Sequence, residues 1–266
     1  MASEPEAFFH ESNGLWIPTE LCRGPWSPGH QHGGPPAALL TRALERVGLN
    51  REEAQIARMS VEFLRPVPLS PLRVTAELLR PGKKVELAGA ALYAGDQEVA
   101  RATSLKVRRK ALELPDVDVS SEVYDPPSAL EGFVFPFFTG DVGYHTAMEL
   151  RIARGIFGSG SVAAWFRMRY PLLAGETPSP AQRVVIAADS GNGISIVLEF
   201  PRWLFINPDL TVHLFREPAG EWVLLDSRTL PVNTGVGLSD TRLHDERGLI
   251  GRSSQSLLID DQQGSG

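Results

Sequence analysis

The sequence predicts an α+β protein in which one folding unit occurs twice. Each half contains a short helical pattern and several strand-like runs, in the same order along the chain. The halves are separated by residues 108–138, a polar segment punctuated by prolines and poor in strand character. One helix packed on a long antiparallel sheet is an α+β layer arrangement. We therefore expect two such units to form a pseudo-dimer within one chain.

The first unit is predicted to contain one helix, at residues 35–47. Apolar residues recur there at three- and four-residue spacing. Pro35 suits a first helical turn because no backbone donor is lost there, and Gly48 is a natural C-terminal stop. The preceding residues 27–34 are too rich in turn formers for regular structure. Strands are expected at 8–18, 19–26, 56–64, 72–79, 85–94 and 98–107.

The second unit repeats this order after the linker. Its helix is expected within residues 178–198, and the stretch from Ala188 to Gly193 is interpreted as a helix opening that carries Asp189. Strands are expected at 144–151, 161–170, 210–215, 222–229, 235–244 and 249–259.

Aligning the two units residue against residue pairs Arg101 with Arg252, and this places Ser104 opposite Gln255. In the helices, the alignment pairs 44–45 with 198–199, which places Pro35 opposite Asp189. The predicted organisation is an N-terminal unit at 1–107, a linker at 108–138, a C-terminal unit at 139–260 and a disordered tail at 261–266.

Composition excludes several classes of function. The net charge of −6 and the pI of 5.6 argue against a nucleic-acid partner, which requires a basic surface. The single cysteine, Cys22, allows neither an internal disulfide nor a cysteine-based zinc site, and we expect it to be a small packed residue. The N-terminus is polar, and no apolar run approaches the roughly 20 residues of a membrane span. A cytoplasmic protein without a membrane partner is expected.

Common catalytic signatures are absent from the sequence. It contains no Gly-x-Ser-x-Gly nucleophile elbow. It has no His-Glu-x-x-His motif, no Walker motif and no dinucleotide fingerprint. We therefore expect neither a metal site nor a cofactor.

Several motifs resemble those of the double hot-dog acyl-CoA thioesterases, the type II bacterial thioesterases and their thioesterase-like relatives. The resemblance covers roughly residues 8–260. The motifs are His32-Gly33-Gly34, residues 63–67, Ala188-Asp189, residues 206–211, residues 245–251 and Gln255. It implies a double hot-dog fold, in which each of two tandem units wraps a long antiparallel sheet around one central helix.

The resemblance also implies the catalytic residues. In the family, one carboxylate on the second helix works with a Thr and a Gln to hold the hydrolytic water. These positions fall on Asp189, Asn207 and Gln255 in this sequence. Asn207 departs from the family pattern, and Gly191 and Gly193 replace bulkier residues beside the carboxylate.

These residue types suit thioester hydrolysis. An ionised Asp can accept a proton from water, and two amide side chains can orient that water. The helix after Gly33-Gly34 can direct backbone N–H groups at a developing oxyanion, because glycine allows a close approach to the backbone. His32 is assigned either to substrate binding and catalysis or to ordering of its loop. Asp189 could instead cap a helix N-terminus.

The predicted function is hydrolysis of acyl-CoA or acyl-carrier thioesters by an Asp-activated water. The alternatives are a non-catalytic acyl-thioester binding module and an enzyme recruited to dehydration or cyclisation of an acyl chain. Open sheet edges allow a homodimer. Aromatic residues expected along an acyl tunnel are Phe63, Trp165, Phe166, Trp203 and Phe205.

Overall fold

The computed structural model describes residues 5–115, 122–138 and 140–262. In the first half, the helical elements are η1 (Glu20–Cys22) and α1 (Gly34–Glu45). The strands are β1 (Phe9–Ser12), β2 (Leu15–Pro18), β3 (Ala54–Phe63), β4 (Leu72–Arg80), β5 (Val85–Ala94) and β6 (Gln97–Arg108).

The second half begins with η2 (Pro127–Ala129) and α2 (Tyr144–Ala147) and contains α3 (Pro180–Ala188) and α4 (Gly191–Ile194). Its strands are β7 (Met148–Gly155), β8 (Ser161–Met168), β9 (Trp203–Ile206), β10 (Asp209–Leu214), β11 (Val223–Pro231), β12 (Val236–Asp245) and β13 (Gly248–Asp261).

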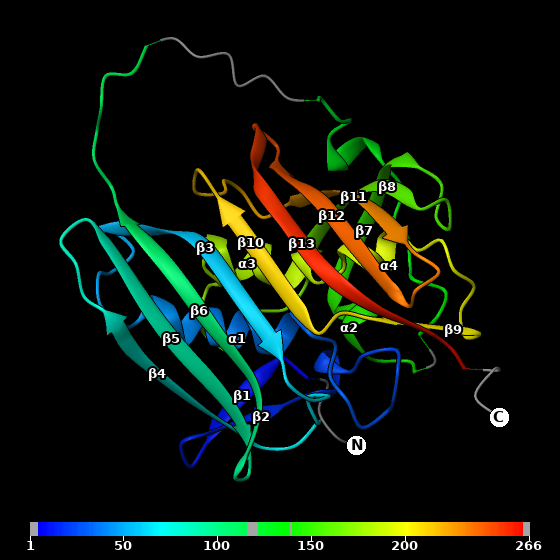
Figure 1. Cartoon of the computed structure of the whole chain (residues 1–266), viewed down its shortest axis with the longest axis horizontal. Helices are drawn as coiled ribbons and strands as arrows, with labels where there is room; N and C mark the ends of the chain where they lie inside the picture. Colours follow the sequence, from blue (N-terminus) through cyan, green and yellow to red (C-terminus); the bar gives the residue numbers. More distant parts are fainter. Residues whose placement is uncertain (1–4, 116–121, 139, 263–266) are drawn as a thin grey trace.

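The strands form one antiparallel sheet in which β3 and β10 join the two halves. The order is β1-β2-β4-β5-β6-β3-β10-β13-β12-β11-β8-β7, and β9 pairs with β13. Figure 1 shows α1 and α3 together on one face of this sheet. The two helices pack closely because Gly34 has no side chain: a Cβ there would lie 2.5 Å from the carbonyl oxygen of Ile186. This is the predicted α+β architecture, with one main helix in each unit.

The strand alignment between the two halves agrees with the observed register. Arg101 pairs with Ala91, and Arg252 pairs with Arg242. Ser104 pairs with Ala88 on the same two strands, and Gln255 pairs with Ser239. One constant offset along the chain relates both sets of partners, so β5 and β6 correspond to β12 and β13.

The helix alignment is wrong. α3 begins at Pro180, where the Ser179 hydroxyl accepts a hydrogen bond from the Gln182 N–H, and it ends at Ala188. Asp189 is therefore the C-terminal cap and does not open a helix, while residues 198–199 lie outside both helices. After Asp189 and Ser190 a second short helix, α4, follows, which contains the glycines at 191 and 193.

Other predicted elements need correction. Residues 19–26 contain the short 3-10 helix η1 instead of a strand. The strand expected at 144–151 begins only at Met148, because α2 occupies the first four of these residues. The segment 127–138, assigned to the linker, contains η2, and Phe135 within it joins the main core. β13 extends to Asp261, and the Gln262 N–H donates to the carbonyl of Arg202, so the tail predicted at 261–266 does not begin at 261. Residues 263–266 lie outside the described part.

Candidate active site

The site lies where the C-terminal end of α3 meets the N-terminal end of α1. Asp189 caps α3 with a helical backbone (φ −63°, ψ −16°), and its side chain is only 3% exposed. Its own helix dipole does not stabilise a carboxylate at this end. The alternative that Asp189 caps a helix N-terminus is therefore wrong, and its carboxylate depends on partners from other elements.

Asn207, just after β9, is the first of these partners. Its side-chain Nδ2 donates to Oδ1 of Asp189 at 2.8 Å and to the backbone carbonyl of Asp209 at 3.1 Å. The amide thus restrains one carboxylate oxygen through an N–H donor. At the position that the family resemblance assigns to Thr, this chain therefore has an amide in contact with the carboxylate.

Gln255 holds the turn that follows Asp189. It is 1% exposed on β13, and its Nε2 donates to the backbone carbonyl of Asp189 at 3.1 Å. Its Oε1 accepts from the Asn192 N–H at 3.0 Å. Nε2 also lies 3.5 Å from Oδ1 of Asp189. Gln255 is not part of the cavity lining, so its contacts order the backbone that carries the carboxylate.

Gly33 lies directly against the carboxylate. A Cβ at this position would meet Oδ2 of Asp189 at 2.7 Å and Cζ of Phe63 at 2.8 Å, so the position has no room for a side chain. Within the described residues, the Gly33 N–H has no hydrogen-bond partner. The two prolines that follow have no N–H, and the Gly34 N–H donates to Nδ1 of His32 at 3.1 Å. The expected cluster of helical donors is therefore reduced to Gly33.

His32 contacts the same carboxylate oxygen, Oδ2, that lies against Gly33. Its Nδ1 lies 3.0 Å from Oδ2 of Asp189. Burial lowers the pKa of His32, and the Asp189 carboxylate partly opposes this shift. The imidazole is thus one of the site residues that the structure brings together.

Tyr144 is a site residue that sequence reasoning missed. Its ring stacks on His32 with centroids 3.7 Å apart and an interplanar angle of 2°. Its hydroxyl is 2.8 Å from the carbonyl oxygen of Ile186, to which it donates, and 2.8 Å from Oγ of Ser190. Tyr144 is fully buried, and burial raises its pKa. No sequence motif marks it, because its role comes from the packing of α2 against the helix pair.

A cavity of about 450 Å³ opens onto this cluster. Its lining includes His32, Gly33, Asp189 and Asn207. Most of the remaining lining is apolar, and its aromatic members are Trp26, Phe63, Phe135, Phe137, Phe138 and Phe205. Three of these phenylalanines come from the segment assigned to the linker, so this segment forms one wall of the cavity.

The predicted acyl tunnel is correct only in part. Phe63 and Phe205 line the cavity, whereas Trp203 does not. Phe166 belongs to the main core, and Trp165 is buried in a separate small cluster beneath Tyr124. Cys22 is buried in η1, and its Sγ donates to the carbonyl of Phe8, as expected for a packed residue.

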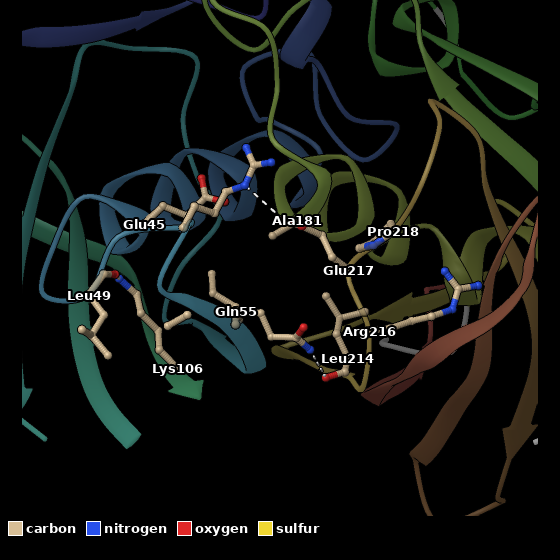
Figure 2. A pocket seen from close by; sticks show the side chains of 12 residues that line it. Glu45, Leu49, Gln55, Lys106, Ala181, Leu214, Arg216, Glu217 and Pro218 are labelled. Carbon is tan, nitrogen blue, oxygen red and sulfur yellow. Dashed lines mark hydrogen bonds and ion pairs between the residues drawn. The ribbon is translucent and has the colours of Figure 1, made fainter. Parts of the chain in front are cut away.

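The opposite end of the helix pair is filled. There Glu45, at the end of α1, accepts hydrogen bonds from Ser179 Oγ and Gln182 Nε2 at the start of α3. The amine of Lys106 donates to the carbonyls of Val47 and Leu49. Figure 2 shows Glu45 and Lys106 around the space that remains, which is about 20 Å³. The helix pair thus has a large cavity at the Asp189 end only, among the described residues.

Two further findings concern ligands and membranes. Across residues 5–115, 122–138 and 140–262, no cluster of His, Cys, Asp or Glu has the arrangement of a metal site. The helices in these residues are too short or too polar to cross a membrane.

The family models together with the fold place the chain among the hot-dog thioesterases. The model of the acyl-CoA thioesterase N-terminal domain matches residues 22–106, and that of the C-terminal domain matches residues 119–259. The chain therefore belongs to the acyl-CoA thioesterase family, as the sequence motifs predicted, and it is an enzyme that hydrolyses acyl-CoA thioesters. No curated protein matches the chain.

Solved structures support the double hot-dog fold. A protein assigned as a thioesterase II from Thermobifida fusca is 16% identical with a TM-score of 0.74, covering 94% of this chain and 93% of that one. A hot-dog protein from Alicyclobacillus acidocaldarius is 15% identical with a TM-score of 0.72, covering 95% of both chains. The acyl-CoA thioesterase II TesB2 from Mycobacterium marinum is 18% identical with a TM-score of 0.64, covering 90% and 92%. At these identities the likeness establishes the fold alone.

Proposed function

We propose that Asp189 is the general base that activates water for attack on an acyl-thioester carbonyl held in the cavity. The observation that carries the proposal is the buried Asp189 carboxylate, which lines the cavity while Asn207 and His32 contact its two oxygens. A general base must lie within hydrogen-bond reach of the water that it deprotonates. Among the described residues that line the cavity, Asp189 is the one with an acidic side chain.

The attack needs a donor for the carbonyl oxygen, and Gly33 suits this role. Its N–H has no partner among the described residues, and Gly33 itself lies against the carboxylate. A backbone donor in a water-poor site stabilises the negative charge that develops on the carbonyl oxygen. Gly34 contributes through helix packing, since its own N–H is used by His32.

Asn207 and Gln255 then have different roles in the proposal. Asn207 fixes one carboxylate oxygen, which keeps the other available to a water or to His32. Gln255 fixes the backbone of Asp189 from beneath. Both reduce the motion of the base before reaction, which is a positional contribution to catalysis.

The cavity supports an acyl-thioester substrate with an apolar acyl group. Its aromatic lining gives the acyl chain an apolar surface, and the volume of about 450 Å³ is within the range of small-molecule sites. The proposed reaction uses side chains, one backbone N–H and water, so we expect no cofactor and no loss of activity with a chelator. Acyl-CoA and acyl-carrier thioesters, and a homodimer formed at the sheet edges, all remain compatible with this site.

The test is a thiol-release assay on acyl-CoAs from short to long, comparing the wild type with Asp189→Asn. We expect release on some chain length and a loss of kcat of about 100-fold or more in the variant. Full activity in a folded Asp189→Asn would refute the base role. Binding without thiol release would favour a binding module, and a product that has lost water would favour dehydration or cyclisation.

A further inference from the structure

One ring nitrogen of His32, Nδ1, has two neighbours that favour opposite protonation states of that nitrogen. Nδ1 lies 3.0 Å from Oδ2 of Asp189 and accepts a hydrogen bond from the Gly34 N–H at 3.1 Å. A neutral imidazole nitrogen either accepts or donates. The Gly34 bond favours the tautomer with Nδ1 unprotonated and the ring proton on Nε2, whereas an ionised Oδ2 favours a proton on Nδ1. In the first tautomer, on which the rest of the inference depends, Oδ2 of Asp189 faces the lone pair of Nδ1. Once Asp189 gains a proton, its O–H donates a hydrogen bond to Nδ1.

The other ring nitrogen is available to a substrate. Nε2 hydrogen-bonds to no described residue, and it is not one of the buried atoms without a partner. Because His32 lines the cavity, this edge of the ring is accessible from the space that holds the thioester. Burial lowers the pKa of His32. The ring is therefore neutral near pH 7 and carries one mobile proton.

We propose that His32 is the general acid that protonates the leaving thiolate and is reprotonated by Asp189. This inference rests on the proposed function, in which Asp189 removes a proton from water. It assigns a second catalytic residue to the same site, and it explains why the imidazole contacts the carboxylate through Nδ1.

The proton transfers balance. Water forms the new C–O bond, and one of its protons goes to Asp189. The tetrahedral intermediate then collapses and its C–S bond breaks. In the same step the sulfur takes the proton of His32 Nε2 and Asp189 gives its proton to Nδ1, so the imidazole stays neutral throughout and the carboxylate is left ionised. The products are the acid and the thiol, and exchange of the ring proton with water through the cavity restores the starting tautomer.

Tyr144 is a positioning residue for this transfer. Its parallel ring, 3.7 Å from that of His32, restrains the imidazole plane, and its hydroxyl is fixed by Ile186 and Ser190. The stacking holds Nδ1 opposite Asp189 while Nε2 faces the cavity. A residue without a ring at position 144 would leave the imidazole free to turn.

The test compares two thioesters with the same acyl group, one of an alkyl thiol such as N-acetylcysteamine and one of an aryl thiol. An aryl thiolate leaves without protonation, whereas an alkyl thiolate benefits from a general acid. We expect His32→Gln to lower kcat about 100-fold on the alkyl thioester and less than about 3-fold on the aryl thioester. The exposed His10→Gln is the matched control and should change neither value.

Variants of Tyr144 and Asp189 distinguish a failure of the His32 role from a failure of the proposed function itself. Tyr144→Leu should give the same selective loss on the alkyl thioester, and Tyr144→Phe, which keeps the stacked ring, should restore the wild-type ratio. Asp189→Asn should lower both substrates. If Asp189→Asn remains active, the proposed function fails. If it is inactive on both substrates and His32→Gln lowers both equally, only the role of His32 is overturned.

A measurement on the wild type covers the case in which the His32 variant does not fold. Nitrogen NMR of the imidazole at neutral pH should show the tautomer protonated at Nε2, with Nδ1 unprotonated. Protonation at Nδ1 would overturn the proposal, because His32 would then have no proton facing the cavity.

Discussion

Gly33 and Asp189 are in such close contact that a Cβ on Gly33 would lie 2.7 Å from one carboxylate oxygen and 3.0 Å from the other. The contact joins the N-terminal end of α1 to the C-terminal end of α3. It brings the residue whose N–H we assign to the oxyanion into contact with the group that we assign to the base. The two units of the chain therefore build one site together.

Gly33→Ala is expected to reduce activity strongly. The added methyl group must displace the Asp189 carboxylate or the ring of Phe63, and a shift of about 1 Å at a reacting group can cost on the order of 100-fold. The measurement is kcat for thiol release, together with Tm. Gly29→Ala is a matched control in the same loop, because a Cβ there meets nothing within 4 Å. Equal activity of the two variants would contradict the contact.

Asn207→Asp should move the acid limb of the pH–rate profile to higher pH. The change places a second carboxylate where Nδ2 now donates to Asp189 at 2.8 Å. Two carboxylates at this distance cannot both ionise readily, so the charge formed first raises the apparent pKa of the second ionisation. Asn207→Thr, which restores the residue type of the family pattern, should leave the limb near its wild-type position. An unchanged profile in Asn207→Asp would argue against Asp189 as the base.

Gln255→Met should destabilise the protein even without substrate. The change leaves the Asp189 carbonyl and the Asn192 N–H without their present side-chain partner, and each unsatisfied buried group costs about 1–3 kcal/mol. Denaturant unfolding measures the effect. Gln97→Met, at an exposed position on β6, is the control. A stability loss no larger than that of Gln97→Met would show that Gln255 does not hold the turn.

The strands were more predictable than the helix end that carries the base. The strand-like run at 85–94 has the observed bounds of β5, and matching Arg101 with Arg252 gave the observed correspondence of Ser104 with Gln255. Asp189 lines the cavity, but it lies at the C-terminal end of a helix and not at the predicted start, because the turn after it is held by Gln255, 66 positions further along the chain. A contact between α2 and His32 leaves no periodic signal in a sequence, so Tyr144 could not be predicted.

Arg65→Ala should weaken binding of acyl-CoA more than it slows the chemical step. Among the described residues that line the cavity, Arg65 is the one arginine or lysine, and it is exposed. An exposed guanidinium suits a phosphate of CoA. We expect KM for an acyl-CoA to rise several-fold with little change in kcat, and a smaller change for the matching N-acetylcysteamine thioester, which has no phosphate. Equal changes for both substrates would place the CoA phosphates elsewhere.

His244 should contribute to loss of stability in acid. It is 1% exposed, neither ring nitrogen has a partner among the described residues, and its ring meets Tyr124 edge-on at 5.1 Å. Burial lowers its pKa, and Arg242 acts in the same direction, whereas Asp226, Glu122 and Asp245 oppose it. The unfolded chain, with a histidine pKa near 6.5, then binds the proton more tightly than the folded protein. The stability linked to neutral His244 is therefore fully present above about pH 6.5, and it is lost as the pH falls from there toward the pKa of His244 in the folded protein.

His244→Phe removes this titration while keeping a ring of similar shape. We expect the fall in Tm between pH 7.5 and pH 5 to become smaller in the variant. It should not vanish, because burial also lowers the pKa of His32 and His145. His10→Phe, at an exposed position, is the control. If the Tm of His244→Phe falls in acid as steeply as that of the wild type, the prediction is wrong. The proton taken up on unfolding then binds to other groups, and His244 does not contribute to the loss of stability in acid.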